Sequence, residues 1–356
     1  MTARALQLGL ICFAVSVANA MRQYLSYSGH FFRSIKTGRF KRSAAVYDDE
    51  CDMAGAIQTD ATEESASIFR ELRAHDPLVV KRKSEGCTIK QSIVDTEHAK
   101  SVLRSFVVEA DDGIANKPGL LLLHTAVGVH DSFILYMSER YAASGFIVLV
   151  HDMYGKDAAA QAWKPGKCNE LMELNRKKRC FQADRALAGL RTLADLPRCD
   201  RSRLVAVGYC YGGQVAMDLV RYLGGNLHRG VSLKAAVTVH GILDACTALR
   251  HSDSLDISGN ATARRLNYLP IPVLCLHGAD DPFVSSFSLN EFLSEMKTSQ
   301  LANVELVSFS NTTHAFTRPE KVPGDDYQAY NARAARRAWT TTLEFISDAL
   351  SQNQCS

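Results

Sequence analysis

The sequence of 356 residues lacks the motifs that would assign it to several large classes of protein. It has no Cys-x-x-Cys pair among its ten cysteines, no His-Glu-x-x-His metal pattern, and no Gly-x-Gly-x-x-Gly or Walker phosphate-binding pattern. Its apolar runs are all too short to cross a bilayer as a helix. We therefore expect no metal, nucleotide or other cofactor, and no stable membrane span.

Acidic residues are missing from the first 47 positions, which carry seven lysines and arginines. Met1–Ala20 has one early arginine, a short apolar run and the small residues Ala18, Asn19 and Ala20, the layout of a cleavable secretory signal. The following basic, serine-rich stretch is typical of an organelle transit peptide. We expect entry into the secretory pathway, for secretion or for a plastid-type organelle through a bipartite leader. A single mitochondrial presequence is the alternative.

The rest of the chain lacks an excess of basic charge. Outside the leader it has 34 basic against 38 acidic residues, a formal charge of about −4, so it offers no basic surface for nucleic acid. We expect residues 21–76 to be a disordered leader and linker, first basic and then acidic. One folded domain, residues 77–352, follows. Two Asn-x-Thr sequons, at Asn260 and Asn311, leave glycosylation open.

Short apolar runs alternate with amphipathic stretches throughout this domain. Continuous apolar runs are typical of parallel strands that are buried on both faces, and they predict strands at residues 119–124, 145–151, 204–209, 234–240, 271–277 and 303–309. Helical spacing of apolar residues predicts helices at 133–143, 181–196, 212–223 and 327–350. This alternation predicts an α/β fold with a mostly parallel central sheet and helices on both faces. Active sites in such sheets gather at the carboxyl ends of the strands.

Cys210 lies in the sequence Gly-Tyr-Cys-Tyr-Gly-Gly between a predicted strand and a predicted helix. This is the cysteine version of the nucleophile elbow, a strained turn that needs small residues two positions before and after the nucleophile. Gly208 and Gly212 meet that need. The N-terminus of the following helix favours the thiolate, and the backbone N–H of Tyr211 is placed to stabilise an oxyanion. The alternative is a buried structural cysteine in a glycine-rich turn.

An elbow nucleophile requires an acid and a histidine, which follow it along the chain in that order. Asp280 and Asp281 come after the strand at 271–277, and His314 comes after the strand at 303–309. Taken singly, the aspartates could form a turn and the histidine could be a solvated loop residue. Their joint order at three strand ends predicts a catalytic triad and hydrolysis through a thioester on Cys210.

These motifs resemble those of the dienelactone hydrolase (carboxymethylenebutenolidase) family, which has the α/β-hydrolase fold. The resemblance covers roughly residues 107–350 and is carried by the segments GYCYGG, HDMYG, KAAVTVHG, HGADDPFV and THAFTR. It implies that Cys210 is the nucleophile and His314 the base, and it selects Asp281 over Asp280 as the acid. It also implies a small-molecule ester or lactone as the substrate. We expect a monomer.

The resemblance further implies the substrate contacts. The backbone N–H of Ala126 corresponds to a second oxyanion donor, and Arg318 matches an arginine that grips a substrate carboxylate. Thr125 stands where the family's dienelactone enzymes have a glutamate beside the thiol. A hydroxyl cannot exchange a proton as a carboxylate does, and this departure favours an alternative, a general carboxylesterase or thioesterase acting on neutral esters. A non-catalytic thiol sensor or binding protein is a further alternative.

Several other polar residues of the domain are interpreted as having no role in catalysis. Four histidines end apolar strands without any metal-ligand spacing, and we interpret them as structural: His124, His151, His240 and His277. The basic cluster Arg176–Arg179 is interpreted as solvated surface.

Overall fold

The computed structural model describes residues 63–164, 166–225, 231–246, 270–299, 302–321 and 327–351. The predicted signal segment, the leader up to residue 62 and Asn260 lie outside these ranges. Along the chain the elements are α2 (Glu63–His75), α3 (Pro77–Ser84), β1 (Ile89–His98), β2 (Ser101–Ala110), β3 (Lys117–Leu123), α4 (Ser132–Ala143), β4 (Ile147–His151), α5 (Lys156–Ala159), α6 (Lys167–Arg176), α7 (Arg179–Ala194), β5 (Cys199–Tyr209), α8 (Tyr211–Gly225), β6 (Ala235–Val239), β7 (Ile271–Gly278), α10 (Ser286–Ser299), β8 (Ala302–Phe309) and α11 (Ala332–Ser351).

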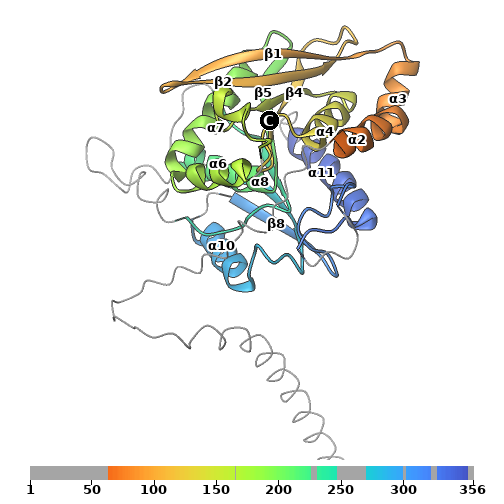
Figure 1. Cartoon of the computed structure of the whole chain (residues 1–356). Helices are drawn as coiled ribbons and strands as arrows, with labels where there is room; N and C mark the ends of the chain where they lie inside the picture. Colours follow the sequence, from red (N-terminus) through yellow and green to blue (C-terminus); the bar gives the residue numbers. More distant parts are fainter. Residues whose placement is uncertain are drawn as a thin grey trace, which may run out of the picture. The chain divides into compact units, whose positions relative to one another are not determined.

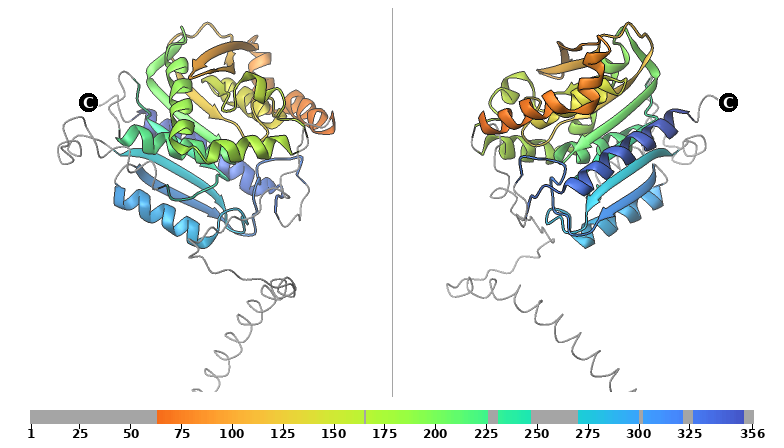
Figure 2. Two further views of the ribbon diagram at one scale, coloured as in Figure 1. Left: turned by 60° about the vertical axis from the view of Figure 1, so that its left-hand side comes forward. Right: turned by 90° about the vertical axis from the view of Figure 1, so that its right-hand side faces the viewer.

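The strands form one sheet in the order β1-β2-β4-β3-β5-β6-β7-β8. In this order, every neighbouring pair of strands from β4 through to β8 is parallel. Strand β2 is antiparallel to both of its neighbours, β1 and β4. Helices α4 and α11 cover one face of the sheet, and α7 and α8 cover the other (Figures 1 and 2). The predicted mostly parallel sheet with helices on both faces is confirmed.

The central strands are apolar where both of their faces are covered. In β5 this holds from Leu204 onwards, since residues 199–203 are half-buried or exposed. Residues 120–123 of β3 and residues 148–150 of β4 are completely buried. The edge strand β8 instead alternates between buried or half-buried and exposed positions. The predicted strand ranges follow the observed ones where the apolar run is continuous, but β5 begins at Cys199, five residues before the predicted range.

The sequence patterns missed the hairpin of β1 and β2, whose ten-residue strands pair along their full length. Strand β1 lies at the edge of the sheet and is mostly exposed, so its sequence IKQSIVDTEH contains no apolar run. The last helix also begins later than predicted, at Ala332. The Asn331 side chain accepts a hydrogen bond from the backbone N–H of Ala334, and this cap sets the beginning of the helix.

The folded part of the chain extends further towards the N-terminus than the predicted domain start at residue 77. Helix α2 lies inside the segment that was expected to be leader and linker. Its Phe69 is fully buried and packs on the rings of Phe133 and Tyr136 in α4, with centroid distances of 6.1 and 5.7 Å. One aromatic anchor therefore attaches α2 to the domain. Among the described residues, the structure contains no helix with both the length and the apolar character needed to span a membrane.

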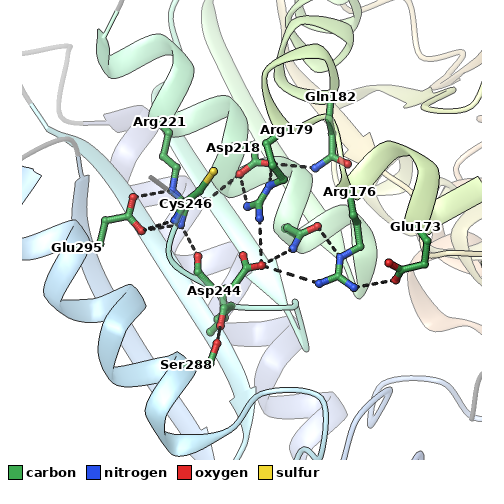
Figure 3. Close-up of polar contacts among 12 residues, drawn as sticks. Glu173, Arg176, Arg179, Gln182, Asp218, Arg221, Asp244, Cys246, Ser288 and Glu295 are labelled. Atoms are coloured by element: carbon green, nitrogen blue, oxygen red, sulfur yellow. Dashed lines mark hydrogen bonds and ion pairs between the residues drawn. The ribbon is translucent and has the colours of Figure 1, made fainter. Parts of the chain in front are cut away.

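A network of buried ion pairs joins α7, α8, α10 and the loop after β6 (Figure 3). Asp218 accepts hydrogen bonds from the Arg179 guanidinium at 2.5 Å and from Arg221 at 2.8 Å. Arg221 also bonds Glu295 at 3.0 Å, and Arg179 bonds Asp244 at 3.0 Å. Asp218 and Arg221 are almost completely buried. The helices on this face are thus held together by charges as well as by apolar contacts.

The interpretation of Arg176–Arg179 as solvated surface was wrong for its two arginines. Arg179 belongs to the buried network, and Arg176 donates to Glu173 and Gln214. Only Lys177 and Lys178, between them, are exposed. The carboxylates of Asp218 in α8 and Asp244 in the loop after β6 turn the guanidinium of Arg179 inwards, and they lie 39 and 65 residues away along the chain.

The network predicts a large stability loss when one of its charges is removed. In Arg221→Met the carboxylates of Asp218 and Glu295 lose a buried partner, and we expect the free energy of unfolding to fall by about 3–5 kcal/mol. Urea unfolding followed by circular dichroism measures this change. The control is Arg201→Met, which removes an exposed pair with Asp195 at 3.5 Å and is expected to cost less than about 1 kcal/mol. Equal losses in the two variants would contradict the prediction.

Candidate active site

Cys210 directly follows β5 and directly precedes α8, and its backbone φ of 55° lies in the left-handed region. A Cβ on Gly208 would lie 2.0 Å from the carbonyl oxygen of Gly212, and a Cβ on Gly212 would lie 2.1 Å from the carbonyl oxygen of Leu123. Both distances are far too short for any side chain. The glycine spacing read from the sequence is therefore a steric requirement of this turn.

The structure brings Cys210, His314 and Asp281 together. The Nε2 atom of His314 lies 3.1 Å from the sulfur of Cys210, and its Nδ1 atom lies 2.7 Å from Oδ2 of Asp281. All three residues are buried, with exposed fractions of 8%, 2% and 5%. Asp280 is exposed. Of the two candidate aspartates, Asp281 is therefore the one that bonds the imidazole, and 104 residues of chain separate the thiol from the imidazole.

The loops after β7 and β8, at the carboxyl edge of the sheet, pack closely and bring the side chains of Asp281 and His314 into line with Cys210. Gly278, at the end of β7, lies very near the loop after β8 that carries His314. A Cβ on Gly278 would be 2.4 Å from the carbonyl oxygen of Thr312 in this loop. The ring of His314 is then held edge-on between the rings of Phe283 and His240, at centroid distances of 4.9 and 5.2 Å. The imidazole is thereby fixed in the plane that reaches both Asp281 and Cys210.

The electrostatics of the site favour an ion pair between the thiolate and the imidazolium. Burial raises the pKa of Cys210, but the charge of His314 and its hydrogen bond outweigh burial, so the pKa falls below its ordinary value. Burial likewise lowers the pKa of His314, but Asp281 and then Cys210 outweigh it and raise this pKa to about 10. Each partner stabilises the charged form of the other.

Two backbone N–H groups face the same sulfur. Those of Tyr211 and Ala126 both lower the pKa of Cys210. The Ala126 loop is held from two sides: the Tyr154 hydroxyl donates to the Ala126 carbonyl at 2.7 Å, and the Thr125 hydroxyl accepts from the Val127 N–H at 3.2 Å. The two predicted oxyanion donors thus converge on the thiol. Tyr154 belongs to the HDMYG segment, one of the segments that carry the family resemblance, but no role was predicted for this tyrosine.

The predicted role of Arg318 as a ligand for a substrate carboxylate is not supported by its surroundings. Arg318 is 4% exposed, and its guanidinium bonds both carboxylate oxygens of Asp131, at 2.6 and 3.2 Å, and also Glu320. The hydroxyl of Thr125 donates to the same Asp131 carboxylate at 2.6 Å. Thr125 and Arg318 therefore join the loop that carries Ala126 to the loop that carries His314 through Asp131, for which no role was predicted.

The four strand-end histidines are buried, and three of them, His124, His151 and His240, bond other groups of the protein. For example, His151 bonds Ser105 and the Arg185 carbonyl, at 3.0 and 2.9 Å, and His240 bonds the Thr317 hydroxyl at 2.8 Å. Burial, followed by the charge of His314, lowers the pKa of His240 well below its ordinary value. Within the described part of the chain, no group of three or more histidine, cysteine, aspartate or glutamate side chains could hold a metal ion.

Comparisons with known proteins agree with this architecture. A model of the dienelactone hydrolase family matches residues 103–350. A putative carboxymethylenebutenolidase of Yersinia pestis is 23% identical over 69% of this chain and 83% of its own length. A carboxymethylenebutenolidase homolog of Rattus norvegicus is 22% identical over 69% of this chain and 88% of its own. An uncharacterized protein of Caenorhabditis elegans is 27% identical over 46% of this chain and 90% of its own.

Solved structures give the same result for the fold. A dienelactone hydrolase-like promiscuous phosphotriesterase from metagenomic libraries superposes with a TM-score of 0.60 at 25% identity, over 73% of this chain and 98% of its own. A structure titled m3DLH superposes with a TM-score of 0.59 at 24% identity, over 74% of this chain and 99% of its own. The predicted α/β-hydrolase fold is confirmed.

The thiolate–imidazolium pair predicts how Cys210 reacts with iodoacetamide as the pH changes. In the wild-type protein the midpoint of its alkylation rate lies below the ordinary thiol value of 9.0. In His314→Gln the charge and the hydrogen bond of His314 are lost, and only the backbone N–H groups of Tyr211 and Ala126 still oppose burial. The midpoint therefore rises, and alkylation at pH 7 slows by about tenfold or more. Mass spectrometry of the labelled peptides measures both rates. The exposed Cys180 is the internal control, whose rate stays unchanged; identical Cys210 profiles in the two proteins would contradict the pair.

Proposed function

The chain belongs to the dienelactone hydrolase family, and from that premise we propose that it hydrolyses small carboxylic esters or lactones with Cys210 as the nucleophile. The observation that carries the proposal is the hydrogen-bonded line from Asp281 through His314 to Cys210, with distances of 2.7 and 3.1 Å. A thiolate, an imidazolium and two converging N–H groups are what acyl transfer to sulfur requires.

In the proposed first half-reaction, the thiolate of Cys210 attacks the carbonyl carbon of the ester. The negative charge that develops on the carbonyl oxygen is stabilised by the N–H groups of Tyr211 and Ala126. The tetrahedral intermediate collapses by breaking the bond to the leaving oxygen. That oxygen takes the proton from Nε2 of His314 and departs as an alcohol, and the acyl group stays on the sulfur as a thioester.

In the second half-reaction, the neutral His314 removes a proton from water at Nε2. The resulting hydroxide adds to the thioester carbonyl, and the new intermediate expels the sulfur of Cys210 as a thiolate. The carboxylic acid leaves, and the thiolate–imidazolium pair is restored. Asp281 holds the imidazole through Nδ1 and stabilises its charged form in both halves.

The surroundings of Arg318 favour neutral substrates over acidic lactones. Its guanidinium is directed to the carboxylates of Asp131 and Glu320, and a substrate carboxylate would have to displace one of them. Thr125, bonded to Asp131, supplies no carboxylate beside the thiol. Within the proposed activity, neutral esters or thioesters are therefore preferred over dienelactones, and turnover of a neutral aryl ester against an acidic lactone compares the two directly.

The proposal predicts an acyl-enzyme on one cysteine. Brief exposure to an activated neutral ester, followed by acid quench and mass spectrometry, is expected to show an acyl adduct on Cys210. The adduct is lost in Cys210→Ala and reduced in His314→Ala, because the thiol then loses the partner that lowers its pKa. The buried Cys168 serves as a control for unspecific acylation. Turnover of the ester without any adduct on Cys210 would reject the proposed nucleophile, and an alkylatable thiol without turnover would favour the sensor alternative.

Two neighbouring aspartates test the assignment of the acid. Asp281→Asn removes the charge that holds His314, and we expect kcat for ester hydrolysis to fall by about 10²–10⁴. Asp280→Asn changes an exposed residue of the same loop and is expected to leave kcat within about twofold. Steady-state kinetics measure both effects. An equal loss in the two variants would indicate damage to the loop rather than loss of the acid.

A further inference from the structure

A cavity of about 380 Å³ lies on the side of the sheet covered by α4 and α11. It is bounded by α2, α4, α11 and the loops that follow β8, which come together on this side in Figure 1. Its volume falls within the range of sites that hold small organic molecules. Neither Cys210 nor His314 is among the residues that line it, so the triad does not account for the cavity.

Four aromatic rings from separate parts of the chain form much of the cavity wall. Tyr136 belongs to α4, Tyr209 is the last residue of β5, Tyr330 lies before α11, and Trp339 lies on α11. Flat, polarisable rings surrounding a cavity of this size favour an apolar or aromatic body in the ligand.

Two arginines also line the cavity, and they differ in how their charges are balanced. Arg140 pairs with Asp76 at 2.9 Å, and its guanidinium lies 3.8 Å from the ring centre of Trp339. Arg336 is exposed, and its guanidinium forms neither an ion pair nor a hydrogen bond with any other residue that the structure describes. Among the residues with a described structure, this guanidinium is therefore a positive charge at the cavity without a partner.

We propose that this cavity is a second ligand site, which binds a small aromatic monocarboxylate. The apolar body lies between the rings of Trp339, Tyr330 and Tyr136, and the carboxylate lies on the guanidinium of Arg336. Aromatic walls and a single unbalanced cation match a molecule with one ring and one negative charge. A planar guanidinium also accepts a carboxylate through two parallel hydrogen bonds.

The cavity is lined by residues next to the triad in sequence or bonded to its neighbours, but not by Cys210 or His314. Tyr209 and Val239 line the cavity and directly precede Cys210 and His240. Thr317, also in the lining, bonds His240 at 2.8 Å, and the ring of His240 packs against His314. A bound carboxylate would therefore touch the supports of the triad without touching the thiol, so its binding and ester turnover can be measured separately.

The experiment follows the fluorescence of Trp339 while 3-phenylpropionate is added. Trp163→Phe is the background, because it leaves Trp339 as the one remaining tryptophan. The full chain is titrated before and after Cys210 is alkylated with iodoacetamide, and the dissociation constant is checked by calorimetry. 3-Phenylpropanol is the uncharged ligand control. Arg337→Gln is the matched control for Arg336→Gln, since Arg337 is the next residue of α11, exposed and outside the cavity lining.

We expect 3-phenylpropionate to bind equally well to the native and alkylated proteins, and 3-phenylpropanol to bind more weakly. Arg336→Gln weakens carboxylate binding by about three- to tenfold, and Arg337→Gln leaves it unchanged. Absence of binding overturns the proposal, as does an equal effect of the two arginine variants or loss of binding on alkylation of Cys210. Ester hydrolysis is measured on the same samples: failed binding with intact hydrolysis rejects the cavity alone, and intact binding without hydrolysis rejects only the proposed activity.

Discussion

The contact between the sulfur of Cys210 and Nε2 of His314 is the interaction on which the rest of the site depends. Burial by itself would keep this thiol protonated, and the imidazolium, itself stabilised by Asp281, reverses that effect. The strained turn at Cys210 and the close approach of Gly278 to the histidine loop are the backbone features that make a 3.1 Å contact possible across 104 residues of chain. The positive φ of Cys210 is an unfavourable backbone conformation, and the close approach at Gly278 excludes any side chain there. Both restrictions are explained by the contact between the sulfur and the imidazole.

Two further polar networks keep this geometry rigid. On one side, Asp131 joins Arg318, which lies four residues after His314, to Thr125, which directly precedes Ala126. On the other, the Tyr211 hydroxyl donates to Gln182, which bonds Asp218 at the centre of the buried ion pairs. Residues on both sides of the thiol are therefore anchored to distant elements. The proposed carboxylate site adjoins the triad at a third place, through Val239 and Thr317, which line the cavity and adjoin or bond His240.

Elements that are set by neighbouring residues could be predicted from the sequence, whereas elements that depend on residues far along the chain could not. Covered parallel strands such as β3 and β5 have continuous apolar runs, and the elbow has a local glycine spacing, so both were predicted from neighbouring residues. Strand β1 is polar and exposed, and only its pairing with β2 makes it a strand. Arg318 was assigned to the substrate from the family resemblance, and its carboxylate partner Asp131, 187 residues away, could not be recognised from the local sequence. Arg179 was misread for the same reason, since its partner Asp218 lies on another helix.

The measurement that tests the central claim most directly is the protonation state of His314, read from the nitrogen chemical shifts of its ring by NMR. With a pKa of about 10, both ring nitrogens are protonated near pH 8 in the wild-type protein, and Cys210→Ala lowers the midpoint of the titration because the thiolate is lost. A ring that is already neutral at pH 8, or a titration that Cys210→Ala leaves unchanged, would contradict the ion pair.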